Sequence, residues 1–94
     1  MEKLAGAVEN YTRARDSFVS GLNKRAYEFK QGNLDIMRLM SNDTELKVIF
    51  NAFVDASIIA GKQAEARQQL MDVAKMSPKL ADSVIEQRAA ALAR

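Results

Sequence analysis

Cysteine, histidine and tryptophan are all absent from the 94 residues, and proline occurs once. Without cysteine the chain can form no disulfide and do no thiol chemistry, and this absence is typical of a reducing compartment. Without histidine it lacks the commonest general base and the commonest metal ligand. Together the two absences exclude ordinary structural zinc sites. The sequence therefore indicates no metal and no cofactor, and we expect a protein that is not an enzyme.

The carboxylates do not change that expectation. Asp82 and Glu86 have the i, i+4 spacing of an acid/base pair, but without histidine or a third ligand this spacing indicates a solvated helix face. Asp43 and Glu45 lack the glycine-containing calcium loop pattern and are better explained as helix-capping residues. The sequence also has no glycine-rich phosphate loop and no nucleophile elbow. Catalysis in a site shared between subunits is the one enzymatic alternative left open.

Long apolar runs are also missing. The first ten residues lack the apolar stretch of a signal peptide, and no segment approaches the ~20 apolar residues that span a bilayer. We therefore expect a soluble, cytoplasmic protein without a membrane partner.

Charge is distributed unevenly along the chain, although the net charge is only +2. Residues 11–30 carry five basic and two acidic side chains, whereas residues 31–72 carry four basic and six acidic ones. Arg13, Lys24 and Arg25 are the candidates for contact with an acidic protein partner or with nucleic acid. A solvated helix face is the favoured explanation of these charges.

What the sequence does contain is helical periodicity. In the first 30 residues apolar side chains recur at steps of three and four, at Leu4, Val8, Tyr11, Phe18, Leu22 and Phe29. No strand-like alternation lasts for more than four residues. The sequence predicts one all-α domain over residues 1–94, with three major helices and a short connector in an antiparallel hairpin or bundle completed by dimerisation. The predicted helices are about 2–30, 34–40, 43–76 and 78–93.

Local signals set these boundaries. Gly32 after Lys30 is typical of a helix C-terminus. Asn42, with Glu45 three residues later, fits a capping box, so the long helix is expected to start at Asp43. Ser77 before Pro78 is a favoured start for the last helix. A single helix from residue 33 to residue 76 is the less favoured alternative.

The stretch from residue 43 to residue 76 organises the rest of the prediction. Thirty-four helical residues would span about 50 Å, whereas a compact domain of this size is roughly 30 Å across. Such a helix either breaks near Gly61 or projects and pairs with another chain. Because its first half is apolar over most of its circumference, we favour pairing.

The predicted interface is this apolar surface. It consists of Leu46, Ile49, Phe50, Phe53, Val54, Ile58 and Ile59. Large exposed apolar patches usually mark interfaces, so we interpret it as a homo-oligomer seam, of coiled-coil type, or as a groove for a partner helix. A monomeric core is the alternative.

We therefore expect a helical protein–protein interaction module that acts as a homodimer or higher oligomer. It would be a small regulator, inhibitor, adaptor or assembly component of bacterial or phage type, with Phe50 and Phe53 as its main anchors. The alternative is a DNA-binding transcriptional regulator with a helical dimer core, which rests on the basic residues between positions 11 and 30.

Overall fold

The computed structural model describes residues 2–25 and 36–93, and within these ranges every regular element is a helix. The prediction of an all-α protein is confirmed. The helices are α1 (Glu2–Lys24), α3 (Ile36–Ser41), α4 (Thr44–Ile59), α5 (Gln63–Asp72) and α6 (Pro78–Leu92).

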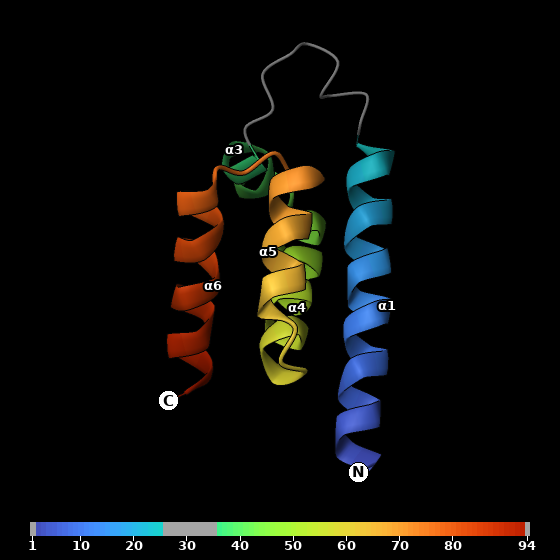
Figure 1. The fold of residues 1–94 in the computed structure, drawn as a ribbon. Helices are drawn as coiled ribbons and strands as arrows, with labels where there is room; N and C mark the ends of the chain where they lie inside the picture. Colours follow the sequence, from blue (N-terminus) through green and yellow to red (C-terminus); the bar gives the residue numbers. More distant parts are fainter. Residues whose placement is uncertain (1, 26–35, 94) are drawn as a thin grey trace.

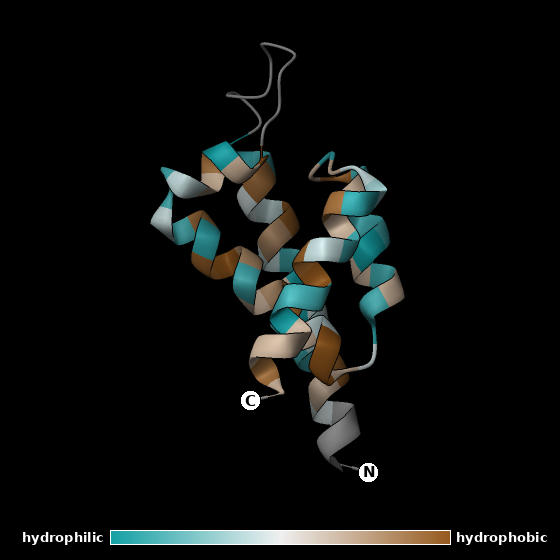
Figure 2. Cartoon of the chain, turned by 90° about the vertical axis from the view of Figure 1, so that its left-hand side faces the viewer, coloured by the Kyte–Doolittle hydropathy of each residue, from teal (hydrophilic) through white to brown (hydrophobic). Residues whose placement is uncertain are grey.

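Helix α4 lies at the centre of the packing (Figure 1). It contacts all four other helices, and its most extensive contact is with α1. In Figure 1, α4 and α6 run downward while α1 and α5 run upward. Each helix alternates apolar and polar segments along its length (Figure 2), as expected when one face of a helix packs on a core.

Aromatic rings from α1 and α4 form the middle of the core. Phe18 stacks on Phe53 with 5.0 Å between ring centroids, and meets Phe50 edge-on at 5.7 Å. Tyr11 also stacks on Phe53, with 5.8 Å between ring centroids. The sequence spacing predicted Tyr11, Phe18 and Leu22 for this face, and all three are buried. Such ring pairs contribute about 0.5–1.5 kcal/mol each beyond the area that they bury.

The sequence favoured one long helix over residues 43–76 and left open a break near Gly61; the structure has the break. Helix α4 ends at Ile59 because Gly61 adopts a positive φ of 69°. The N–H of Lys62 then donates to the carbonyl of Ser57 at 2.7 Å, and the N–H of Gly61 donates to that of Ile58 at 3.2 Å. This pair of hydrogen bonds is the Schellman motif, which satisfies carbonyls at a helix end. The chain reverses there, so that α5 covers one side of α4.

The other boundaries agree in part with the prediction. Helix α1 runs from Glu2 to Lys24. The predicted helix end at residue 30 lies outside the described ranges, as do the first two residues of the predicted connector. The second half of the long helix ends at Asp72, where residue 76 was expected. Ser77 caps α6 by accepting a hydrogen bond from the N–H of Leu80, and Pro78 is its first residue, as predicted.

The break before α4 also lies where it was expected, which rules out the single helix from residue 33 to residue 76. The capping group is the carboxylate of Asp43, which accepts from the N–H of Leu46 at 3.0 Å. Asn42 does not cap the helix; its side-chain amide donates to the carbonyl of Arg38.

Candidate functional site

Four of the seven predicted interface residues lie in the core of a single chain. Leu46, Phe53 and Val54 are fully buried and Phe50 is 4% exposed. The sequence pattern identified a surface that must be covered, but the break at Gly61 lets the chain cover it with its own helices. For these four residues the alternative of a monomeric core describes the structure.

The remaining three lie at the edge of that core or outside it. Ile49 and Ile58 are partly buried, whereas Ile59 is 66% exposed. Val48 is 62% exposed, and Ala52, between Val48 and Ile59, is also exposed. At about 100° per residue, Val48, Ala52 and Ile59 fall within about 40° of one another, roughly opposite Leu46. We refer to these three residues as the outer face of α4.

Neighbouring helices flank the outer face without covering it. On one side α1 approaches so closely that a methyl group at Gly21 would lie 3.6 Å from Cδ1 of Ile49. On the other side Arg88 of α6 donates two hydrogen bonds to Asp55 of α4, at 2.8 and 2.7 Å. The outer face is the strip between these two contacts, and it is about 16 Å long from Val48 to Ile59.

The apolar surface extends from α4 onto α6. The two helices run in the same direction (Figure 1), and the pair Asp55–Arg88 sets their register. One turn further along each helix come Ile59 and Leu92, which are 66% and 43% exposed. On two parallel helices, equal numbers of residues span equal distances along the helix axis. We therefore expect Leu92 to lie level with Ile59 and to enlarge the exposed patch at that end.

Charged side chains lie at the two ends of the outer face. Glu45, in the first turn of α4, has a side chain that is 75% exposed. Lys62, just beyond the last turn, has a side chain that is 42% exposed and lies 3.9 Å from Glu65. The strip is therefore acidic at one end and basic at the other.

The three predicted basic contact residues do not form one patch. Arg13 and Lys24 are exposed on the same side of α1 but lie roughly 16 Å apart, and Arg13 is 3.6 Å from the carboxylate of Glu9. Arg25 points elsewhere, since it joins the end of α1 to the start of α4.

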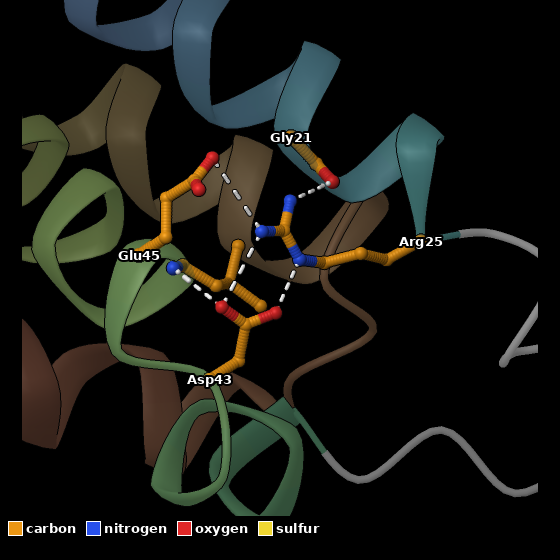
Figure 3. A network of polar contacts seen from close by, with 5 residues as sticks. Gly21, Arg25, Asp43 and Glu45 are labelled. Atoms are coloured by element: carbon orange, nitrogen blue, oxygen red, sulfur yellow. Dashed lines mark hydrogen bonds and ion pairs between the residues drawn. The ribbon is translucent and has the colours of Figure 1, made fainter.

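Figure 3 shows the contacts of Arg25. Its guanidinium donates to both carboxylate oxygens of Asp43 and to the carbonyl of Gly21, and it lies 3.7 Å from Glu45. The hydrogen bond from Arg25 lowers the pKa of the Asp43 carboxyl, and the N–H of Leu46 lowers it further. The same hydrogen bond raises the pKa of Arg25. Arg25 is therefore a structural ion-pair residue with little of its charge available to a partner.

A cleft of about 250 Å³ lies between α3, α4 and α6, and sequence reasoning did not find it. In the short connector, which was predicted at residues 34–40, Ile36 and Met40 are buried, but Met37 is 45% exposed at the edge of the cleft. That exposure follows from how α3 packs and has no signal in the sequence. The lining residues are Met37, Met40, Ser41, Lys47, Phe50, Asn51, Val84, Gln87 and Arg88.

Among the described residues, no group of three acidic side chains is arranged to hold a metal ion. None of the described helices has the length and hydrophobicity needed to traverse a bilayer.

Comparison of the chain with protein-family models, with curated proteins and with solved structures found no match.

Proposed function

We propose that this protein is a non-enzymatic helical interaction module that forms a homodimer through the outer face of α4. The observation that carries the proposal is the exposure of Val48 and Ile59, at 62% and 66%, on the most apolar helix of the chain. Burying apolar side chains of this size against a second protein stabilises the complex.

The spacing of the residues favours a second copy as that partner. In an antiparallel pair of α4 helices related by a two-fold axis at the middle of the strip, Val48 of one copy lies opposite Ile59 of the other. A two-fold interface is self-complementary, and the two contacts between Val48 and Ile59 are apolar on both sides. The same axis places Ala52 opposite Asp55 of the other copy, whose carboxylate is already bound by Arg88 of its own chain. The small side chain of Ala52 lies near the axis, where it allows close approach of the two helices.

Charge supports the same orientation. The two-fold arrangement places Glu45 of each copy beside Lys62 of the other. A parallel pairing would instead bring Glu45 next to Glu45 and Lys62 next to Lys62. Like charges in contact oppose association and opposite charges favour it, so the antiparallel pair is preferred.

The size of the strip sets the expected affinity. Stable interfaces bury about 800 Å² on each partner, and one helix face about 16 Å long provides less than that even with Leu92 added. We therefore expect a reversible dimer that dissociates on dilution, in roughly the micromolar range.

The DNA-binding alternative gains nothing from the arrangement of the basic side chains. Recognition of a duplex needs several basic side chains on one face, whereas Arg25 is engaged by Asp43, and Arg13 and Lys24 are well separated.

The test is sedimentation velocity over a dilution series, comparing the wild type with Ile59→Glu and Val48→Glu. Each substitution places a carboxylate in the apolar contact, and we expect each to leave a monomer at concentrations where the wild type is a dimer. Ala64→Glu is the control, because Ala64 is exposed on α5 and is not one of the outer-face residues. A wild type that stays monomeric at the highest concentration, or a dimer that both variants retain, would refute the proposal.

Orientation is tested by exchanging the end charges. Glu45→Lys and Lys62→Glu should each weaken the dimer, and the double variant should recover much of the loss. Because Glu45 also lies near Arg25, the thermal midpoint of each variant is measured alongside. If the single variants lose association and the double variant does not recover it, the antiparallel arrangement is wrong. The outer face of α4 would then still be the interface.

A further inference from the structure

We propose that the cleft between α3, α4 and α6 is a binding site for a small organic carboxylate with an aryl or alkyl body. The proposal does not require the homodimer, because Lys47 and Asn51 project from α4 roughly 60–140° away from Val48 and Ala52.

The interior of the cleft selects an apolar body. Its floor and walls include Phe50 and Val84, which are nearly buried, together with Met40 at 6% exposure and Met37 at 45%. Methionine side chains adapt their shape and make favourable contacts between sulfur and aromatic rings. A volume of about 250 Å³ corresponds to about eight groups the size of a water molecule. The cleft therefore suits one phenyl ring or a short alkyl chain.

The rim of the cleft selects a negative head group. Lys47 lines the cleft, and no carboxylate of the described part of the chain forms an ion pair with it. Its ammonium group is free to meet an anion without first breaking a contact.

Arg88 supplies a second donor in a fixed position. Its Nε and Nη2 donate to the two oxygens of Asp55, at 2.8 and 2.7 Å. These two bonds hold the guanidinium plane and leave the hydrogens of Nη1 for another acceptor. The side-chain amides of Asn51 and Gln87 also line the cleft and add neutral donors. A carboxylate beside Lys47 and Arg88 would make charge-assisted hydrogen bonds, whereas an ammonium head group would be repelled.

The methionine methyl groups report binding at individual positions, inside the cleft and outside it. We would label the methionine methyl groups with ¹³C and titrate the full chain with 3-phenylpropionate, 3-phenylpropan-1-ol and 3-phenylpropylammonium, which share one body and differ in head-group charge. Met37 and Met40 line the cleft and Met71 and Met76 do not. With the carboxylate we expect saturable shifts at Met37 and Met40 only, with a dissociation constant in roughly the millimolar range for a ligand of this size. The alcohol should bind more weakly and the ammonium compound not measurably.

Three variants complete the test. Lys47→Met removes the charge at an exposed position and should weaken binding of 3-phenylpropionate about five- to tenfold, while leaving binding of the alcohol unchanged. Lys79→Met, an exposed lysine of α6 outside the cleft, is the control and should bind like the wild type. Gln87→Trp covers the cleft from its exposed edge and should abolish all binding. Equal affinity for the three compounds, equal loss in both lysine variants, or shifts at Met71 and Met76 would each overturn the proposal.

Discussion

Asp55 and Arg88 join the two parallel helices α4 and α6 through a two-point ion pair, with nitrogen–oxygen distances of 2.8 and 2.7 Å. Both side chains are largely covered, at 25% and 33% exposure. The pair lies between the outer face of α4 and the cleft. It therefore fixes the register on which both proposed sites depend.

We expect Asp55→Asn to lower the free energy of unfolding by about 1–2 kcal/mol, because it removes the charge of a bidentate and partly buried pair. Urea unfolding followed by circular dichroism measures this loss. The control is Asp82→Asn, since Asp82 contacts Arg67 through one hydrogen bond and is 51% exposed. Exposed pairs of this kind contribute about 0.2–1 kcal/mol. Equal losses in the two variants would show that the two-point contact adds no stability.

The sequence predicted the helical class and several helix ends because those depend on neighbouring residues. Asp43, Ser77 and Pro78 act within one turn of the helices that they start, so their residue types were sufficient. Tyr11 and Phe18 were predicted as core residues from helical spacing, which is also local.

The break at Gly61 and the exposed part of α4 were harder to predict, because both depend on long-range packing. A single glycine lowers helix stability by about 1 kcal/mol, which does not decide whether a helix continues. Whether the helix ends there depends on the apolar area that α5 covers once the chain has reversed direction at Gly61. The same packing divides the predicted interface into the buried Phe50 and the exposed Ile59, and it creates the cleft beside Lys47.

The two glycines Gly61 and Gly6 should respond to alanine in opposite directions. Neither position has a neighbouring atom within 4 Å of a new methyl group, so sterics with the rest of the chain play no part. Gly61 has a φ of 69°, where alanine is strained by about 1 kcal/mol. Gly6 lies within α1, where alanine is favoured by up to about 1 kcal/mol.

We therefore expect Gly61→Ala to lower the thermal midpoint and Gly6→Ala to raise it or leave it unchanged, as measured by differential scanning calorimetry. If Gly61→Ala were as stable as the wild type, α4 and α5 would have joined into the continuous helix that the sequence first suggested. An increase in far-ultraviolet helical signal would accompany that outcome.

The ion pair between Arg25 and Asp43 should make stability depend on pH in the acidic range. The hydrogen bond from Arg25 lowers the pKa of Asp43 below its usual value of 3.8, so the folded state binds this proton less tightly than the unfolded state does. The stabilisation is fully present above pH 3.8 and is lost as pH falls through the lowered pKa. Asparagine is also a good capping residue, so Asp43→Asn removes the ion pair and keeps the cap.

We expect the urea midpoint of Asp43→Asn to be below that of the wild type at pH 7 and to approach it at pH 2.5. Asp43→Ala should be less stable than either at both values, because it also loses the cap, at about 1 kcal/mol. Glu86→Gln, an exposed position on α6, controls for the loss of one carboxylate. A constant difference between Asp43→Asn and the wild type across this range would show that the carboxylate charge does not stabilise the fold.

The hydroxyl group of Tyr11 is buried, and it has no hydrogen-bond partner among the described residues. Burial is the main cause that raises the pKa of this phenol above 10.0, and the nearby carboxylate of Glu65 raises it further. A buried hydroxyl without a partner carries a desolvation cost of about 1–3 kcal/mol. Tyr11→Phe removes this cost and keeps the ring that stacks on Phe53.

We therefore expect Tyr11→Phe to match or exceed the wild type in free energy of unfolding at pH 7, and Tyr11→Leu, which loses the stacking, to be less stable. Because the raised pKa keeps the folded phenol protonated, the wild type should lose stability as pH rises above 10, where the unfolded phenol ionises. Tyr11→Phe has no such group and should lose less over that range. If Tyr11→Phe were instead less stable than the wild type by about 1 kcal/mol or more at pH 7, the hydroxyl would have a partner in solution, most simply a buried water molecule.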